Sequence, residues 1–212
     1  GHIYLGEHQG WYAVSDEAFY PESQICATKQ QSGSSSETVY TSIETGQRVE
    51  WTTETNYKFR LSAFQQPLLD WLENNREVIQ PSNMYDHVLA EVRSGLQDLS
   101  ISRLRSRLSW GIPVPGDPQH TMYVWMDALV NYMTALGYPD MQPGWPADVH
   151  IVGKDIVRFH AIYWPAFLMA AGLPLPRTIV AHSHWTVNKA NCLAGLVKIC
   201  ACALPIRQVH NQ

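Results

Sequence analysis

The chain has 212 residues, of which 45% are hydrophobic and 16% are charged, a balance typical of globular proteins rather than disordered ones. Its formal net charge of -4 gives no overall attraction to nucleic acid, and no apolar run reaches the length of a membrane span. This length fits one large domain or two small ones. The chain opens in strand-like sequence at Gly1, so no targeting peptide is expected in it.

The first sixty residues are predicted to be rich in β-structure, with two hairpins. Residues 2–5 and 11–14 flank a turn that contains glycine, and residues 38–43 and 48–51 flank a second such turn. Between the hairpins, residues 28–37 are polar and rich in serine. This composition predicts a flexible loop without a packed face.

Three helices are expected in the next part of the chain. Thr52 or Thr53 can cap the first one, and the aromatic residues that follow predict a helix as far as Phe64. Residues 67–74 and 82–94 then carry apolar side chains at helical spacing, with a glycine directly after the second segment.

A local group of basic residues follows in this acidic chain, at Arg93, Arg103, Arg105 and Arg107. Such a group can bind a phosphate backbone, but alternating charges more often form the solvated face of a strand, and this second interpretation is favoured. Residues 110–118 contain three prolines and two glycines, which indicates a rigid segment and a domain boundary.

From about residue 119 the pattern changes to alternating strands and helices. Strands are predicted at 121–125, 149–152 and 177–181, with helices at 126–136 and from Asp155 to Gly172 between them. The order β-α-β-α-β predicts a parallel sheet with right-handed crossovers. In such sheets ligands bind at the carboxyl ends of the strands, where the residues with functional side chains are Trp125, Asp127, Asp155, His182, His184 and Trp185.

The helix after Asp155 is the most informative element. Asp155 and Phe159 are four residues apart, as are His160 and Trp164, so each pair shares a helix face. A carboxylate beside aromatic rings suits a small ligand with an ammonium group and an apolar or thioether end. Residue spacing alone favours the alternative, an aromatic core helix with Asp155 as its N-cap.

Neither metal site that can be drawn from the sequence is favoured. His182 and His184 could ligate a metal, but no third ligand stands out, and a structural histidine is the favoured role. Three of the four cysteines, at 192, 200 and 202, could be combined with His210, but their spacing matches no standard zinc pattern. The glycine signatures of dinucleotide-binding and P-loop enzymes are also absent from the sequence.

Six segments closely resemble the methionyl-tRNA synthetases, which are class I aminoacyl-tRNA synthetases, and most closely their short mitochondrial form. The similarity extends from residue 1 to about 187. The segments are GWYAVSDEAFYPESQ (10–24), VEWTTETNYKFRLSAF (49–64), DLSISR (98–103), WGIPVPGDP (110–118), YVWMDALVNY (123–132) and GKDIVRFHAIYWPAF (153–167).

The resemblance implies a fold and a site. Residues 1–118 resemble an inserted connective-peptide region and its helical return, and residues 119–187 resemble the second half of a Rossmann-like nucleotide-binding fold. Residues 188–212 have no counterpart in the family and are expected to form a divergent, poorly ordered tail. The implied fold class is therefore α/β. By resemblance, Asp155 binds the methionine ammonium group, Tyr132 and His160 lie at the thioether, and Trp125, Phe159 and Trp164 repack around the side chain. Gly153, His182 and Trp185 match positions near the adenosine.

The implied activity is ligation of methionine to its tRNA, with ATP and Mg²⁺, as a monomer in the mitochondrial matrix. No bound zinc is expected, because Cys26 stands alone in the region where larger relatives carry a zinc knuckle. The 212 residues contain neither of the family's ATP boxes, His-Ile-Gly-His and Lys-Met-Ser-Lys-Ser. We therefore expect the chain alone to be inactive. The alternatives are a non-catalytic module that binds methionine, tRNA or a partner, and a related synthetase for another apolar amino acid.

Overall fold

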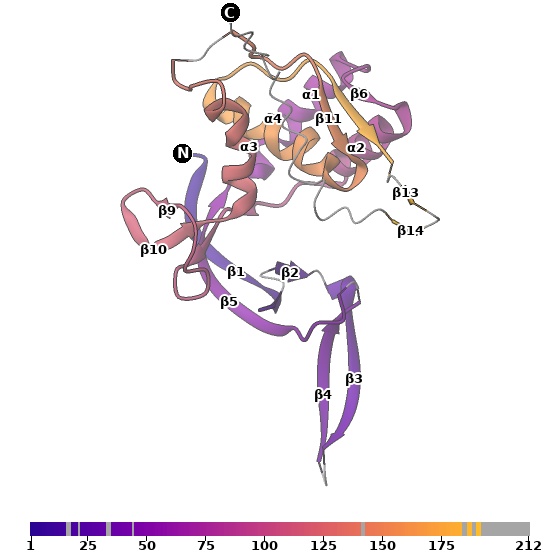
Figure 1. The fold of residues 1–212 in the computed structure, drawn as a ribbon, viewed down its shortest axis with the longest axis vertical. Coiled ribbons are helices and arrows are strands. Elements are labelled where there is room, and N and C mark those ends of the chain that lie inside the picture. The colour runs from indigo at the N-terminus through magenta and orange to yellow at the C-terminus, as the bar shows by residue number, and fades with distance from the viewer. Residues whose placement is uncertain are drawn as a thin grey trace, which may run out of the picture. The chain divides into compact units, whose positions relative to one another are not determined.

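The computed structural model describes residues 1–15, 18–20, 22–32, 35–43, 45–140, 143–183, 186–187 and 190–191 (Figure 1). The chain divides into two compact units. Unit 1 comprises residues 1, 3–59 and 100–124, and unit 2 comprises residue 2, residues 60–99 and the chain from residue 125 onward. Unit 1 consists mainly of β-strands, whereas unit 2 combines helices with a small parallel sheet, so the fold is mixed α/β.

The main sheet of unit 1 is built on one long antiparallel pair of strands. Strand β1 (Ile3–Ala13) pairs with β5 (Glu50–Phe59), and β2 (Ala18–Tyr20) and β7 (Leu99–Ser100) complete the order β2-β1-β5-β7. The hairpin predicted within residues 2–14 is therefore wrong, because β1 continues through both glycines of the expected turn.

The helix predicted to begin at Thr52 or Thr53 is also wrong. These residues lie in β5, whose register with β1 runs from Ile3 opposite Phe59 to Tyr12 opposite Glu50. Threonine and aromatic residues favour strands when a partner strand is available. The chain becomes helical only after Arg60, with a 3-10 turn η2 (Leu61–Phe64).

Residues 28–32 and 35–37 lie in paired strands rather than in a loop. Strand β3 (Ile25–Ser32) pairs antiparallel with β4 (Ser35–Ser42), so backbone hydrogen bonds order these polar residues. A short 3-10 turn η1 (Glu22–Gln24) precedes it. The second predicted hairpin is reduced to an isolated bridge between Thr41 and Arg48.

A second antiparallel sheet in unit 1 contains the strand that the sequence had placed in the parallel sheet. Its order is β8-β10-β9, formed by Ser102–Leu104, Asp117–Met122 and Pro113–Val114. The strand predicted at 121–125 therefore ends at Met122 and pairs with β8 and β9, not with residues 149–152.

The parallel sheet of unit 2 has the order β11-β12-β6. Strand β11 (His150–Gly153) and strand β12 (Ile179–His182) correspond to two of the predicted strands. The third member is β6 (Ile79–Gln80), which comes from a distant part of the sequence and pairs parallel with β12. A two-residue strand carries no periodicity, so the sequence could not indicate it.

The helices of unit 2 agree with prediction more closely. They are α1 (Gln65–Asn74), α2 (Ser82–Ser94), α3 (Val124–Thr134, whose first residue belongs to unit 1) and α4 (Trp164–Ala171). Before α4 the chain forms a 3-10 turn η3 (Lys154–Ile156) and a π-helix η4 (Phe159–Tyr163). Gly172 ends α4 with a φ of 66°, a left-handed conformation that glycine adopts without strain.

The core of unit 2 lies where these helices meet the parallel sheet. Leu68 and Leu72 of α1, Val88 of α2, and Ile162 and Leu168 around α4 are each at most 1% exposed. The last described strands, β13 (Thr186–Val187) and β14 (Ala190–Asn191), form a small antiparallel pair. Across the described residues, every helix is either too short or too polar to traverse a bilayer.

Candidate functional site

Three predicted site residues lie at the carboxyl edge of the parallel sheet. Gly153, the last residue of β11, is in register with His182, the last residue of β12. Asp155 follows in η3 and is exposed to solvent. His184 and Trp185 lie outside the described residues, as do Cys192, Cys200, Cys202, His210 and nearly all of the 188–212 tail.

Trp125 and Phe159 form a stacked aromatic pair. Trp125 lies in the first turn of α3, and its ring centroid is 3.9 Å from that of Phe159 in η4, with an interplanar angle of 26°. Phe159 in turn contacts the ring of Tyr163 edge-on at 5.4 Å. Trp125 and Phe159 are both half-buried, so part of each ring is accessible to a ligand. Phe159 lies only four residues after Asp155 in the sequence.

Tyr132 and His160 are joined by a hydrogen bond of 2.8 Å between the phenol oxygen and Nε2. The other ring nitrogen of His160, Nδ1, lies 2.9 Å from the carbonyl oxygen of Ile156. A carbonyl only accepts, so Nδ1 carries the proton and Nε2 of the neutral ring accepts from the Tyr132 hydroxyl. Burial lowers the pKa of His160, against the opposing effect of its bond to Ile156, and favours this neutral form.

The π-helix explains the arrangement of this segment. A π-helix places its hydrogen bonds five residues apart, and such turns occur frequently at functional sites. Pro165, the second residue of α4, has no amide hydrogen to donate to the preceding helical turn. His160, within the π-helix, is 6% exposed. Trp164, the first residue after the π-helix, is 2% exposed.

Two further aromatic residues belong to the same cluster, and sequence reasoning missed both. His150, the first residue of β11, lies 4.6 Å from the Tyr132 ring and 5.8 Å from the His160 ring, measured between centroids. Trp145, in the loop before β11, lies 5.7 Å from Trp164 and 6.2 Å from His150. A histidine in an otherwise apolar strand was the available signal for His150.

His150 is an unusual buried group. It is 6% exposed, and its Nε2 has no hydrogen-bond partner among the described residues; the same is true of Nε1 of Trp164. Burial, and then the nearby His160, lower the pKa of His150 to about 4. The imidazole is therefore neutral at physiological pH. We use the name aromatic cluster for Tyr132, Trp145, His150, His160 and Trp164.

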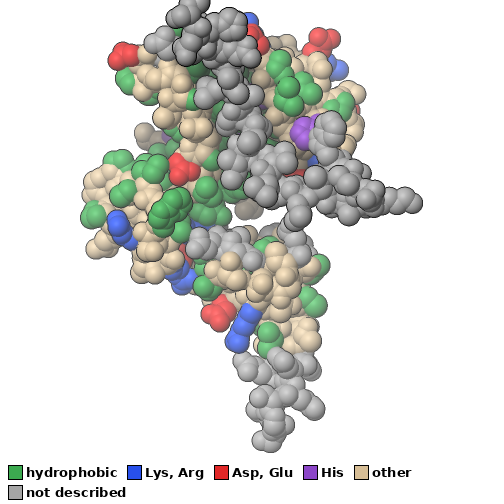
Figure 2. Space-filling view, in the orientation of Figure 1, with side chains coloured by type: hydrophobic (Ala, Val, Ile, Leu, Met, Phe, Trp, Pro, Cys, Tyr) green, Lys and Arg blue, Asp and Glu red, His purple; other side chains and the backbone are tan. Residues whose placement is uncertain are grey.

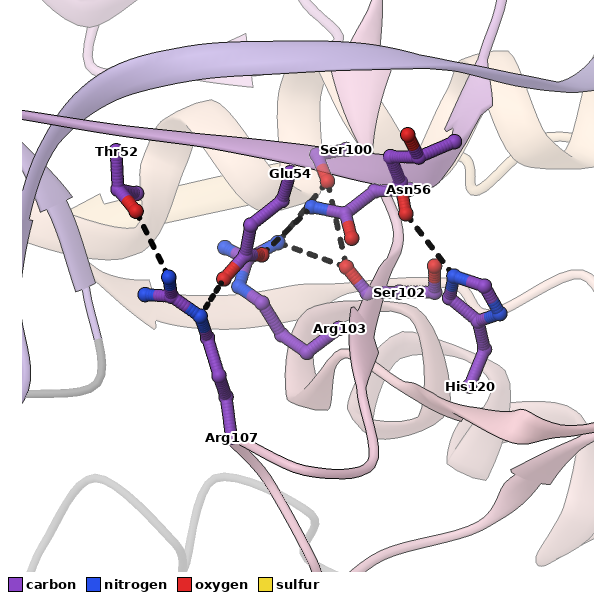
Figure 3. A network of polar contacts seen from close by, with 9 residues as sticks. Thr52, Glu54, Asn56, Ser100, Ser102, Arg103, Arg107 and His120 are labelled. Carbon is purple, nitrogen blue, oxygen red and sulfur yellow. Dashed lines mark hydrogen bonds and ion pairs between the residues drawn. The ribbon is translucent and has the colours of Figure 1, made fainter.

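Unit 1 contains a separate buried polar network around Glu54 of β5 (Figure 3). The Glu54 side chain is fully buried, and its Oε1 lies 2.6 Å from Nε of Arg107, although this ion pair lacks hydrogen-bond geometry. Asn56 donates to Oε2 of Glu54 at 3.1 Å, and Arg107 donates to the Thr52 hydroxyl at 2.8 Å. A carboxylate buried in this way depends on its cation for compensation.

Arg103 is the second cation of this network and, unlike the exposed Arg107, it is buried. It is 3% exposed, so it does not lie on the solvated face of a strand. Its Nη1 donates to Ser100 Oγ at 2.9 Å and to the Ser102 carbonyl at 2.8 Å, and its guanidinium carbon is 3.9 Å from the centroid of the Tyr123 ring. Burial lowers the pKa of Arg103, while neighbours that include Tyr123 and Glu54 oppose this shift.

The other three arginines of the group are exposed, as the favoured interpretation expects, but none lies in a strand: Arg93 belongs to α2, and Arg105 and Arg107 follow β8. Arg93 pairs with Glu73 on the surface at 2.8 Å, and Arg107 pairs with Glu54. Figure 2 shows Lys and Arg side chains scattered singly over the visible face. The described residues contain no group of three or more His, Cys, Asp or Glu side chains arranged to hold a metal ion.

Comparisons with known proteins identify the family of the chain. A family model described as tRNA synthetases class I (M) matches residues 1–192. A probable mitochondrial methionine--tRNA ligase of Schizosaccharomyces pombe is 53% identical over 207 residues, covering 92% of this chain and 37% of that protein. The human mitochondrial methionine--tRNA ligase is 52% identical, covering 88% and 31%, and a methionine--tRNA ligase of Rickettsia bellii is 50% identical, covering 88% and 35%.

The structural comparison gives the same family. A crystal structure of Mycobacterium tuberculosis methionyl-tRNA synthetase bound by methionyl-adenylate matches with a TM-score of 0.76 and 45% identity, covering 92% of this chain and 37% of that chain. The chain thus spans about a third of the length of the curated relatives it matches. Because the family model covers most of its residues, the chain belongs to the class I methionyl-tRNA synthetases.

Proposed function

We propose that this chain supplies the methionine-recognition part of a methionine--tRNA ligase. The observation that carries the proposal is the stacking of Trp125 on Phe159. Phe159 lies four residues after Asp155, whose carboxylate is exposed to solvent. A carboxylate binds an ammonium group, and polarizable sulfur packs favourably against aromatic rings. Methionine carries both groups, and a solved relative is bound by methionyl-adenylate.

The roles of the individual residues follow from this proposal. Asp155 binds the methionine ammonium group, Tyr132 and His160 lie at the thioether, and the tryptophans and Phe159 enclose the side chain; the full methionine set is Trp125, Tyr132, Asp155, Phe159, His160 and Trp164. Gly153, His182 and Trp185 contact the adenosine of ATP. The pairing of Gly153 with His182 at the sheet edge supports this second assignment.

In the proposed reaction a methionine carboxylate oxygen attacks the α-phosphorus of ATP. The new O–P bond forms as the bond to the departing pyrophosphate breaks, and the methionyl group then passes to the 3′ end of the tRNA. The residues of this chain hold the amino acid for that attack, which is catalysis by positioning. Mg²⁺ would neutralise phosphate charge, and we propose no zinc.

We also propose that residues 1–118 form the connective-peptide region, residues 119–187 the second half of a Rossmann-like nucleotide-binding fold, and residues 188–212 a divergent tail. A monomer in the mitochondrial matrix is proposed, and the mitochondrial ligases among the relatives support that location. Methionine--tRNA ligases of two Rickettsia species are almost as similar, at 50% identity.

Methionine binding tests the proposal directly. The 212-residue chain is titrated into methionine labelled with ¹³C at its methyl group, and binding is followed by NMR. Asp155→Asn is expected to weaken binding about 10- to 100-fold, the usual contribution of a charged hydrogen bond. The matched control is Asp140→Asn, which changes an exposed carboxylate elsewhere in unit 2. Equal effects of the two substitutions would contradict the role given to Asp155.

A non-catalytic binding module is the second candidate function. The observation in its favour is the exposed Asp155 carboxylate together with the Trp125–Phe159 pair, which can hold methionine without any chemical step. Both candidates require methionine binding, and they differ in turnover. Methionine-dependent exchange of pyrophosphate into ATP separates them.

A further inference from the structure

We propose that His150 is a positioning residue of the methionine site, which holds the Tyr132 ring where its hydroxyl reaches Nε2 of His160. This inference rests on the proposed function. It extends the site to a residue of β11 that contributes through Tyr132 and does not touch the substrate. The role depends on the shape and neutrality of the imidazole ring.

The geometry of three rings carries the proposal. The His150 centroid is 4.6 Å from that of Tyr132, which makes it a nearer ring neighbour than His160 at 5.8 Å or Trp164 at 6.0 Å. The hydroxyl of Tyr132 reaches His160 Nε2 at 2.8 Å only for a limited range of ring orientations. A ring in contact with Tyr132 restricts that range.

The surroundings of the His150 nitrogen Nε2 indicate that His150 positions Tyr132 through contact between the rings and not through a hydrogen bond. Its Nε2 is buried and has no partner among the described residues. A buried polar atom without a hydrogen-bond partner destabilises a protein. Nε2 therefore supplies no hydrogen bond that would hold the His150 ring in its observed position. The His150 side chain instead contacts the rings of Tyr132, Trp145 and His160.

Neutrality of His150 matters because His160 lies next to it. The neutral, Nδ1-protonated form of His160 directs the Tyr132 hydroxyl proton toward Nε2. The charged residue directly before η4, Arg158, is 54% exposed and pairs with Glu91 of α2 at 2.8 Å. Because the His150 imidazole beside Tyr132 is also uncharged, the thioether end of the site contains no charged ring. An uncharged environment suits a thioether sulfur better than one that contains a charged side chain.

The experiment compares three variants of the 212-residue chain. His150→Phe retains a ring of similar size, His150→Ala removes it, and His87→Phe changes an exposed histidine of α2 as a control. The ¹⁵N and ¹H signals of His160, measured at pH 7 without ligand, report its tautomer and the hydrogen bond to Nε2. Titration with methionine and with norleucine, which has a methylene in place of sulfur, reports the preference for the thioether.

We expect His150→Ala to shift the Nε2 signal of His160 toward that of an unbonded nitrogen. We also expect its preference for methionine over norleucine to fall roughly 2- to 12-fold, the range of a sulfur–aromatic contact. His150→Phe and His87→Phe are expected to retain both properties. Should His150→Ala fail to fold, His150→Phe still decides, because loss of the His160 signal in a folded phenylalanine variant contradicts a role based on ring shape.

The inference and the proposed function fail in different ways. If the His160 signal depends on residue 150 as expected but the unchanged chain does not bind methionine, the proposed function is contradicted while the positioning of Tyr132 stands. If methionine binds and His150→Ala leaves both the His160 signal and the methionine preference unchanged, the positioning role is overturned.

Discussion

Trp125 stacks on Phe159 at 3.9 Å, which brings the start of α3 against the π-helix that follows β11. These residues are 34 positions apart in the sequence. The pair therefore joins two elements of unit 2 at the candidate site. A stacked aromatic pair contributes about 0.5–1.5 kcal/mol beyond the surface area that it buries.

Trp125→Ala is expected to reduce both the stability of unit 2, by at least about 1 kcal/mol, and the affinity for methionine. Trp125→Phe retains a ring for stacking and should lose less of each. Trp110→Ala is the matched control, since Trp110 is 86% exposed in unit 1. Urea unfolding and NMR titration measure the two properties, and equal losses for positions 110 and 125 would argue against the stacked pair.

Local signals in the sequence predicted the helices of unit 2 well. Residues 82–94 were predicted as a helix, and α2 has the same bounds, because its apolar spacing and the glycine after it are properties of the segment itself. The long segment after Asp155 was also predicted to be helical, although its division into a 3-10 turn, a π-helix and α4 was not.

The failures share a physical cause, which is that a strand depends on a distant partner. Residues 52–59 have the helix-like local features of a threonine cap followed by aromatic residues, yet they pair with β1 more than forty positions away in the sequence. The same dependence explains β6 and the reassignment of residues 121–122 to an antiparallel sheet. For the aromatic cluster, the sequence indicates Tyr132, His160 and Trp164. A histidine within the apolar segment 149–152 is a local signal for His150, but it does not show which rings lie beside it, and Trp145 has no such signal.

The stability of the protein is expected to depend on His150 in acid. Burial, together with His160, lowers its pKa from 6.5 to about 4, so between these values the unfolded chain binds a proton that the folded chain does not. Stability from this group is therefore complete above pH 6.5 and is lost as the pH falls toward 4, with a total on the order of 3 kcal/mol.

Urea midpoints measured from pH 7 to pH 4 test this dependence. His150→Phe should flatten the curve over this interval and should be more stable than the unchanged chain at pH 5. The exposed His87→Phe control should leave the slope as it is. A slope that is unaffected by His150→Phe would mean that other groups cause the acid sensitivity.

Glu54 and Glu50 lie on the same strand and provide a matched pair of substitutions. The Glu54 side chain is fully buried against Arg107, whereas that of Glu50 is 67% exposed and lies 3.7 Å from Arg48. Glu54→Gln removes the negative charge that pairs with Arg107 and that interacts electrostatically with the buried Arg103. This substitution is expected to destabilise unit 1 by about 3–5 kcal/mol. Glu50→Gln should change stability by less than about 1 kcal/mol.

Urea unfolding followed by tryptophan fluorescence, with Trp11 and Trp51 in unit 1 as reporters, distinguishes the two substitutions. A small effect of Glu54→Gln, similar to that of Glu50→Gln, would show that the buried network contributes little. A large effect together with unchanged methionine binding would establish that the network stabilises unit 1 and takes no part in the site.

The 212-residue chain is expected to bind methionine without catalysing methionine-dependent exchange of pyrophosphate into ATP. Asp155 and the aromatic residues would hold the amino acid, whereas the family's two ATP boxes, which are absent from these residues, would bind the triphosphate and stabilise charge as pyrophosphate leaves. Removal of a single stabilising donor of this kind typically lowers a rate by about 10²–10³. Loss of two whole boxes should therefore abolish measurable exchange. The assay uses the purified chain, with an intact methionyl-tRNA synthetase as positive control. Robust exchange by the chain, once contamination by an intact enzyme is excluded, would show that residues of the 212-residue chain carry the chemistry.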